Sequence, residues 1–181
     1  REPRPVTVGD RLEHRGLVGD EDLGDEAPVG PGAHPVVESV EVEPIELAEA
    51  PPIVIACSHE PGVTHEQVAG VRARYELQPD ACAAIFDQVY ALSTAGAKAL
   101  VSGEYAALGQ LMDLCHGLLN ALGVSTPGLE RMIDIARKAG AAGAKLTGAG
   151  GGGSMIALCP GCVDEVATAL QASGFRTMGL D

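Results

Sequence analysis

The pattern of apolar and polar positions changes along the 181-residue chain. Residues 1–35 show neither helical nor strand periodicity, and Pro, Gly and runs of acidic residues interrupt them, which is typical of a flexible leader. Apolar and polar residues then alternate over residues 36–43, and residues 53–57 form a short apolar run. These two segments predict strands that are close enough in sequence to pair with each other. We therefore expect an acidic leader over residues 1–35 and one domain over residues 36–181.

Helical spacing replaces alternation in the middle of the chain. Apolar residues recur every three or four positions in four segments, which predict four helices. The first begins at Thr64, where Thr64 and Gln67 suggest a capping box. The other three predicted helices cover residues 79–101, residues 104–122, and a segment that begins at Pro127 and ends before Gly140.

A glycine-rich segment separates these helices from a last group of predicted elements. A strand is expected over residues 154–159, a helix over residues 163–172 and a short strand over residues 175–178. Residues 148–153 would then connect a helix to a strand. The order of elements predicts an α+β domain with helices packed on a mainly antiparallel sheet.

Composition narrows the classes of protein that fit this pattern. The net charge of −13, with twelve basic residues in total, argues against a nucleic-acid partner. Thirteen of the twenty-five acidic residues lie in the first fifty positions, so the acidity belongs mainly to the leader. Five cysteines without a disulfide spacing favour a reducing cytoplasmic location. No apolar run approaches the roughly 20 residues that a membrane span needs.

Residues 148–153 hold five glycines in six positions and formally satisfy G-x-G-x-x-G. A dinucleotide-binding loop needs a strand before it and a helix after it, and the predicted order here is the reverse. A Walker motif is excluded because no Gly-Lys-Ser/Thr follows at the required spacing. Two interpretations remain. The loop binds an anion through successive N–H groups, with Lys145 and Thr147 at its entrance, or it needs glycine only to approach a neighbouring backbone.

Several segments resemble one family of enzymes. Residues 145–153, KLTGAGGGG, resemble the third, C-terminal glycine motif of the GHMP small-molecule kinases, in the form found in mevalonate kinases of the archaeal type. Residues 116–125, HGLLNALGVS, and the segments 53–58 and 68–72 are similar to further parts of the same enzymes. The resemblance covers residues 36–181.

The resemblance implies a ferredoxin-like C-terminal domain and ATP-dependent phosphorylation of mevalonate in isoprenoid biosynthesis, with Mg²⁺ as the metal. It assigns nucleotide binding to the glycine motif and its flanks, and it places no metal ligand and no catalytic residue in this chain. The implied nucleotide-binding residues are Lys145, Thr147, Gly148, Ala149, Gly150, Gly151, Gly152, Gly153 and Ser154.

Asp113, His116 and Asn120 share one face of the third predicted helix. The resemblance implies that His116 and Asn120 bind the substrate. The alternative is an ordinary helix face with a hydrogen-bonded histidine. Two positions depart from the family pattern, since Cys115 stands where Asn is expected and Ser154 where Cys is usual.

The family's N-terminal motifs find no match in the sequence, neither the Pro-x-x-x-Gly-Leu-Gly-Ser-Ser-Ala phosphate loop nor the catalytic aspartate region. We therefore expect the chain to be inactive by itself and to need an N-terminal domain supplied in trans. A homodimer is a further possible assembly. The alternative within the family is a non-catalytic GHMP-like domain or subunit.

A thiol redox protein is an alternative from another class. Cys159 and Cys162 form a C-x-x-C motif between a predicted strand and a predicted helix, where a helix N-terminus lowers the pKa of a thiol. Cys57 and His59 would be accessory metal ligands in that interpretation. The four helices that precede the motif disfavour it, because a thioredoxin-like fold needs a βαβ unit there.

Overall fold

The computed structural model describes residues 6–7, 44–60 and 62–179. The chain divides into two compact units, residues 1–48 and 49–181. In the first unit, β1 (Val6–Thr7) pairs antiparallel with β2 (Glu46–Leu47). The rest of the predicted leader, the predicted strand over residues 36–43 and the predicted domain boundary all lie outside the described residues.

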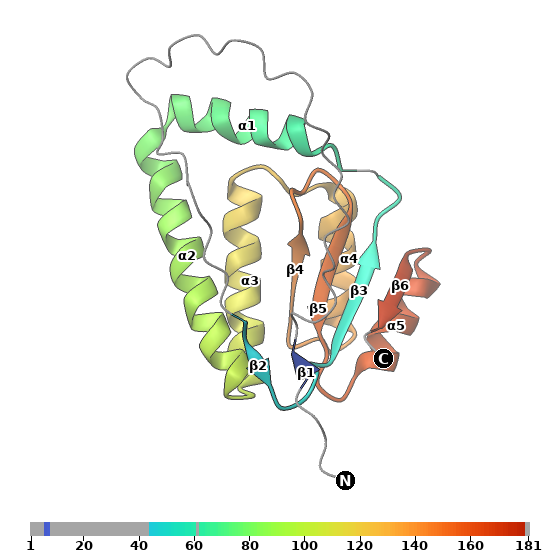
Figure 1. Cartoon of the computed structure of the whole chain (residues 1–181). Helices are drawn as coiled ribbons and strands as arrows, with labels where there is room; N and C mark the ends of the chain where they lie inside the picture. The colour runs from blue at the N-terminus through green and yellow to red at the C-terminus, as the bar shows by residue number, and fades with distance from the viewer. Residues whose placement is uncertain (1–5, 8–43, 61, 180–181) are drawn as a thin grey trace, which may run out of the picture. The chain divides into compact units, whose positions relative to one another are not determined.

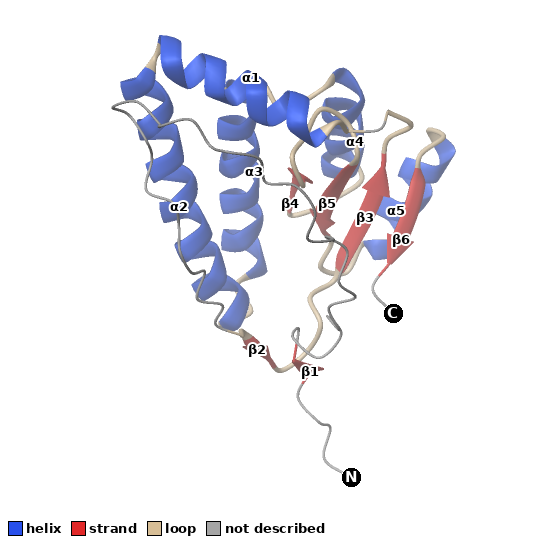
Figure 2. Ribbon diagram, turned by 45° about the horizontal axis from the view of Figure 1, so that its top comes forward, coloured by secondary structure: helices blue, strands red, loops and turns tan. Residues whose placement is uncertain are grey.

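The second unit is built on a four-stranded antiparallel sheet (Figures 1 and 2). Its strands lie in the order β4 (Gly143–Thr147), β5 (Ser154–Leu158), β3 (Ile53–Cys57) and β6 (Arg176–Gly179). Helix α4 (Pro127–Lys138) leads into β4, and α5 (Val163–Ala172) connects β5 to β6, which gives the split βαβ arrangement of a ferredoxin-like fold. The predicted fold class is therefore confirmed.

The core lies between one face of this sheet and the helices α4 (Pro127–Lys138) and α5 (Val163–Ala172). Alternate residues of the strands point to that face, because the side chains of a strand alternate between its two sides. Both helices lie behind the sheet in Figure 1 and present an apolar stripe to it. The fully buried side chains of this core include Val54, Leu146, Met155, Leu129, Met132, Ile133, Val166 and Leu170.

Three helices are inserted between β3 and α4: α1 (Thr64–Leu77), α2 (Pro79–Val101) and α3 (Tyr105–Ala121). Helix α3 lies beside β4 at the edge of the sheet, α2 packs on the outside of α3, and α1 contacts α2 (Figure 1). Gly109 of α3 touches β4 so closely that a Cβ added to Gly143 would lie 2.0 Å from the Gly109 carbonyl oxygen. Glycine at both positions is what lets this helix approach the strand.

The four predicted helices of the middle segment are present, and the second has the predicted bounds. The capping box at Thr64 is wrong. Thr64 lies inside the helix, and Val63 precedes it without a side-chain cap. Helix α4 has a true cap, since the Thr126 hydroxyl accepts a hydrogen bond from the Leu129 N–H at 3.3 Å.

Two predictions about the sheet are wrong. We expected β3 to pair with the strand predicted over residues 36–43. This pairing is wrong, because β5 and β6 occupy the two edges of β3. The strand β4 was not predicted, so the glycine segment joins two strands instead of a helix and a strand. The β4 sequence, GAKLT, contains one β-branched residue and therefore has low strand propensity, and its Gly143 makes the close contact with α3.

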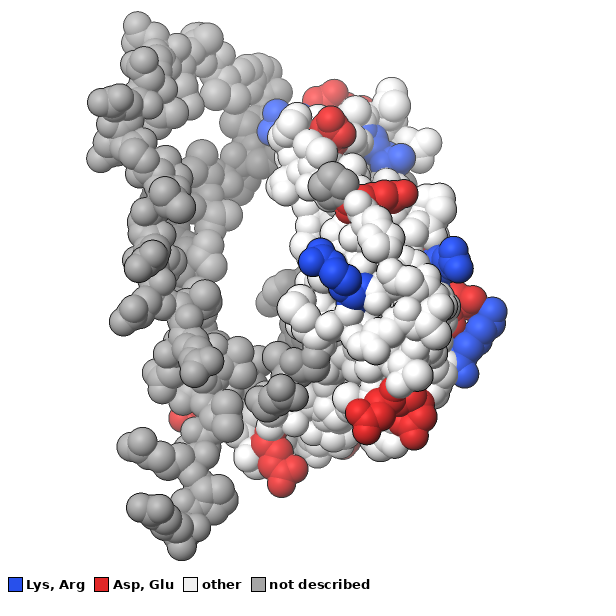
Figure 3. All heavy atoms as spheres, turned by 90° about the vertical axis from the view of Figure 1, so that its right-hand side faces the viewer, with Lys and Arg blue, Asp and Glu red and all other residues white. Residues whose placement is uncertain are grey.

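The surface of the described part of the chain mixes both signs of charge. On the face drawn in Figure 3, acidic and basic side chains are scattered among uncharged ones. None of the helices within the described ranges has the length and apolar character that crossing a membrane requires.

Candidate functional site

The glycine loop, residues 148–153, forms the turn between the antiparallel strands β4 and β5. Five of its six residues have φ between +70° and +123°, a region that costs other L-residues conformational energy. The prediction that several of these glycines have positive φ is confirmed. Positive φ explains why glycine is needed at positions such as Gly148 and Gly153, where an added Cβ would meet open space.

Gly150 and Gly152 are needed for a second reason, which is close packing against backbone. A Cβ on Gly150 would lie 2.2 Å from the Val124 carbonyl oxygen, and one on Gly152 would lie 2.5 Å from the Glu60 carbonyl oxygen. A Cβ on Gly151 would lie 2.3 Å from Nε2 of the Gln67 side chain. The loop is therefore held by the segment after β3, the first turn of α1 and the α3–α4 turn. The interpretation that glycine allows a close backbone approach is confirmed for this part of the loop.

Two N–H groups of the loop are used to hold it in place. Gly151 donates to the Val124 carbonyl at 2.8 Å, and Gly153 donates to the Glu60 carbonyl at 2.9 Å. The N–H groups of Ala149, Gly150 and Gly152 have no hydrogen-bond acceptor on any other described residue. A braced loop with unused N–H groups is the arrangement that binds phosphate in backbone anion sites.

The predicted residues that flank the loop have different surroundings. Lys145 and Thr147 are half-buried on β4, and the Lys145 ammonium donates to the Leu146 carbonyl at 2.9 Å. Ser154, the first residue of β5, has its hydroxyl 3.3 Å from the Cys57 thiol. The three side chains thus lie on the strands at the base of the loop, and Lys145 and Thr147 lie where they were expected, at its entrance.

A hollow of about 310 Å³ opens beside the segment that supports the loop. The end of β3 and the first turn of α4 line it, with Glu60 and Arg131 as its charged residues. Phe175 forms its apolar wall, with His59 stacked at 6.1 Å and the Arg131 guanidinium over the ring at 5.9 Å.

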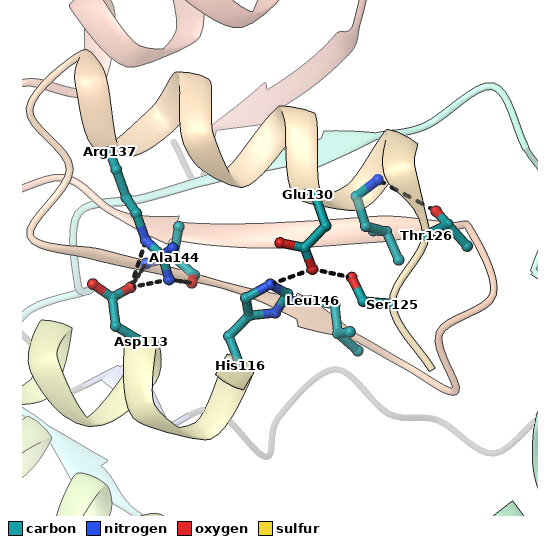
Figure 4. Close-up of polar contacts among 9 residues, drawn as sticks. Asp113, His116, Ser125, Thr126, Glu130, Arg137, Ala144 and Leu146 are labelled. Atoms are coloured by element: carbon teal, nitrogen blue, oxygen red, sulfur yellow. Dashed lines mark hydrogen bonds and ion pairs between the residues drawn. The ribbon is translucent and has the colours of Figure 1, made fainter. Parts of the chain in front are cut away.

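Polar side chains of α3 accept hydrogen bonds from backbone N–H groups along the outer edge of β4 (Figure 4). The Asp113 carboxylate accepts from the Ala144 N–H at 2.9 Å, and it also accepts from Arg137 of α4 at 2.7 and 2.9 Å. Arg137 in turn donates to the Ala144 carbonyl at 3.2 Å. The edge strand that leads into the glycine loop is thus closed by side chains instead of by another strand.

His116 lies one helical turn after Asp113 and is 3% exposed. Its Nε2 is 3.0 Å from the Glu130 carboxylate, and its Nδ1 lies 3.5 Å from the Leu146 N–H (Figure 4). Because Nδ1 faces a donor, the hydrogen bonds select the neutral ring with the proton on Nε2. Burial lowers the pKa of His116 below 6.5, while Glu130 opposes this shift and Arg137 and Lys145 add to it.

The lowered pKa predicts a loss of stability in weak acid. As the pH falls below about 6.5, His116 becomes protonated in the unfolded chain, whereas in the folded chain it takes up the proton only at a lower pH. The free energy of unfolding should therefore fall between pH 7 and pH 5, and less steeply in a His116→Gln variant. Urea unfolding across this range measures both slopes, and equal slopes would contradict the prediction.

The two predicted substrate residues differ in exposure. Asn120 is exposed near the end of α3, whereas His116 is buried with both ring nitrogens engaged. Substrate binding by either residue stays a prediction. Cys115, where the family pattern has Asn, is buried, as unpaired cysteines usually are.

Sequence reasoning missed the residues of α4 and the turn before it that complete these contacts. Glu130 accepts hydrogen bonds from His116 and from the Ser125 hydroxyl, the latter at 2.5 Å, and Arg137 pairs with Asp113. The two α4 residues are seven positions apart and therefore lie on one face of the helix. That spacing was visible in the sequence, but their partners became identifiable only with the packing of α3 against β4.

The C-x-x-C pair does not form an activated thiol site. Cys159 is fully buried, and burial, followed by the neighbouring Cys162, raises the pKa of its thiol to about 12. The Cys162 thiol donates to the Gly140 carbonyl at 3.2 Å. The proposed accessory ligands are engaged separately, Cys57 with Ser154 and His59 with the Gly174 carbonyl. The redox interpretation is therefore not favoured.

We expect Cys159 to resist alkylation in the native chain. With a pKa of about 12, only about one in ten thousand of its thiols is ionised at pH 8, and the thiolate is the reactive form. Iodoacetamide labelling followed by peptide mass spectrometry should find Cys159 modified after unfolding in urea and unmodified before it. The half-exposed Cys162 is the internal comparison. Rapid native labelling of Cys159 would contradict its burial.

Within residues 6–7, 44–60 and 62–179, no three His, Cys, Asp or Glu side chains are grouped closely enough to hold a metal ion. The residues at the glycine loop offer hydrogen-bond donors and the positive charge of Lys145.

Comparison with known proteins identifies the class to which this arrangement belongs. Residues 97–176 match the family described as GHMP kinases C terminal. They include α3, the α3–α4 turn, β4, the glycine loop and β5. The chain thus carries a C-terminal domain of the GHMP kinase family.

Among GHMP kinases, the chain is homologous to mevalonate kinases. It is 49% identical over 119 residues to the mevalonate kinase of Methanothermobacter thermautotrophicus, covering 66% of this chain and 39% of that protein. It is 46% identical over 132 residues to the mevalonate kinase of Pyrococcus abyssi, covering 70% of this chain and 39% of that protein. The chain therefore spans about two-fifths of the length of these relatives.

Solved structures agree with this placement. The Leishmania major mevalonate kinase, crystallised with R-mevalonate, superposes with a TM-score of 0.67 at 28% identity, covering 72% of this chain and 40% of that one. The Methanococcus jannaschii mevalonate kinase superposes with a TM-score of 0.60 at 28% identity, covering 71% and 38%. The predicted family and its fold are confirmed.

Proposed function

We propose that this chain is the C-terminal part of an ATP-dependent mevalonate kinase and that its glycine loop supports the nucleotide phosphates. The observation that carries the proposal is the loop itself, which is braced by Val124 and Glu60 and leaves three N–H groups without acceptors among the described residues. The mevalonate kinase relatives support the choice of substrate.

The residues at the loop fit a phosphate ligand. The N–H groups of Ala149, Gly150 and Gly152 have no acceptor on another described residue, and Thr147 and Ser154 lie at the two ends of the loop. Lys145 contributes positive charge from β4. Phosphoryl transfer needs such donors because negative charge is spread over the phosphate oxygens in the transition state. We propose that Asn120, exposed on α3, lies on the substrate side of the site.

Mg²⁺ would neutralise phosphate charge in the complete enzyme. Since the described residues hold no metal-ligand cluster, we propose that the ion is held by the nucleotide and by the region of the relatives that this chain does not span. The catalytic groups would come from the same region. This chain would then bind and position, and it would phosphorylate nothing by itself. The reaction would take place in the cytoplasm, as part of isoprenoid biosynthesis.

A recombination experiment tests the proposal. The chain is mixed with a separately expressed N-terminal part of an archaeal relative, and ADP release is measured with ATP, Mg²⁺ and mevalonate. We expect turnover that requires both chains and mevalonate. ADP release without mevalonate, or with galactose in its place, would contradict the proposed substrate. Turnover by the 181-residue chain alone would contradict the assignment of catalysis to the other part.

A further inference from the structure

His116 connects two segments that both hold the glycine loop. On one side, its Nδ1 lies 3.5 Å from the N–H of Leu146, two residues before the loop begins. On the other side, its Nε2 is 3.0 Å from Glu130, which also accepts from the Ser125 hydroxyl. Ser125 follows Val124, whose carbonyl accepts the Gly151 N–H. The loop is thus held at its start and at its middle by groups that His116 joins. Figure 4 shows His116 with Leu146, Glu130 and Ser125.

We propose that His116 is a positioning residue that sets the place of the glycine loop through Leu146 and through the link from Glu130 to Ser125. The proposal rests on the proposed function, because that function gives the loop its phosphate-binding role. His116 acts without touching a ligand, since it is 3% exposed and both of its ring nitrogens are engaged. A buried network in which every member is satisfied favours one arrangement of the segments that it connects.

The same link is sensitive to protonation of the ring. A proton on Nδ1 would place a donor against the Leu146 N–H, so the contact with β4 would be lost. The charged groups around His116 are Glu130 and Arg137 on α4, Lys145 on β4, and Asp113 one turn earlier on α3. Glu130, which is held at the far side of the ring, and Asp113 would gain attraction, but neither restores an acceptor for the Leu146 N–H. Acid should therefore loosen the start of the loop.

Amide hydrogen exchange in the ¹⁵N-labelled 181-residue chain tests the link without any activity. Ser125→Ala removes one hydrogen bond of the network, and Glu130→Ala removes two. We expect the Gly151 amide to exchange about tenfold faster in both variants, while the Met155 and Ala157 amides of β5 are unchanged. Asp134→Ala is the matched control, because it breaks an exposed ion pair with Lys138 one turn from Glu130.

A purely structural role would give a different result. Gly151, Met155 and Ala157 would then change together, because global unfolding exposes all of them, and that outcome would overturn the proposal. Unchanged exchange of Gly151 would overturn it as well. In wild type, the Leu146 and Gly151 amide shifts should also follow one titration below pH 6.5, and this titration should be absent in His116→Gln.

The recombined enzyme separates failure of the link from failure of the proposed function. We expect Ser125→Ala to lower kcat severalfold with the KM for mevalonate unchanged, because the loop would serve the phosphates. If wild type is inactive after recombination although Gly151 responds as expected, the proposed function fails and the link in the fold stands. If wild type is active and Ser125→Ala alters neither kcat nor Gly151 exchange, the positioning role is wrong.

Discussion

Gly150→Val is expected to abolish mevalonate phosphorylation by the recombined enzyme, with a loss of at least about a hundredfold in kcat, the scale of removing one preorganised donor. A Cβ at this position would lie 2.2 Å from the Val124 carbonyl oxygen, and the residue has φ of +80°. A branched side chain therefore moves the loop away from the α3–α4 turn and displaces its free N–H groups. Coupled measurement of ADP release before and after substitution reports the loss.

Two controls separate this effect from general unfolding. Gly117→Ala lies on the exposed side of α3, where nothing is within 4 Å of the added Cβ, and should retain full activity. Gly148 and Gly150 have nearly the same φ, +78° and +80°, but a Cβ on Gly148 would meet nothing within 4 Å. Gly148→Ala is therefore the control for Gly150→Ala. Both alanine variants carry the cost of positive φ, so the larger loss of stability in Gly150→Ala measures the clash alone. Equal losses would show that Val124 does not confine the loop.

Gly109→Ala should destabilise the domain strongly. Its Cβ would lie 2.2 Å from the Ala142 carbonyl oxygen, and Gly143 on the other side of the contact has equally little room. The neighbour is backbone, which cannot rotate aside, so α3 must move from the edge of β4. We expect a loss of about 3 kcal/mol, at the upper end of overpacking costs. For a chain of this size, the melting midpoint would fall by roughly 6–12 °C.

Gly117→Ala on the same helix is the matched control for this prediction too. Its Cβ would meet nothing within 4 Å, so the better helix propensity of alanine should raise stability by about 0.5–1 kcal/mol. Opposite signs for two identical substitutions in one helix would identify the helix–strand contact as the cause. A stabilising Gly109→Ala would mean that α3 lies farther from β4 than the structure shows.

The local structure of several segments could be predicted from the sequence alone. The helices were predictable because apolar residues at helical spacing must share one face, and α2 has the predicted bounds. The positive φ of the glycine loop followed from five glycines in six positions, since other residues rarely adopt that conformation. The family resemblance rested on short segments such as residues 145–153, and it also implied the ferredoxin-like fold.

The contacts between residues far apart in the sequence were decided by the tertiary structure alone. Strand β4 was missed because it begins with Gly143, which contacts Gly109 of α3 closely, and Ala144, and such small residues carry little strand signal. The role of His116 could not be read from its helix, because its partners, Leu146 and Glu130, lie 30 and 14 residues away. Contacts between residues so far apart in sequence arise only when helix and sheet pack together, and no local pattern encodes them.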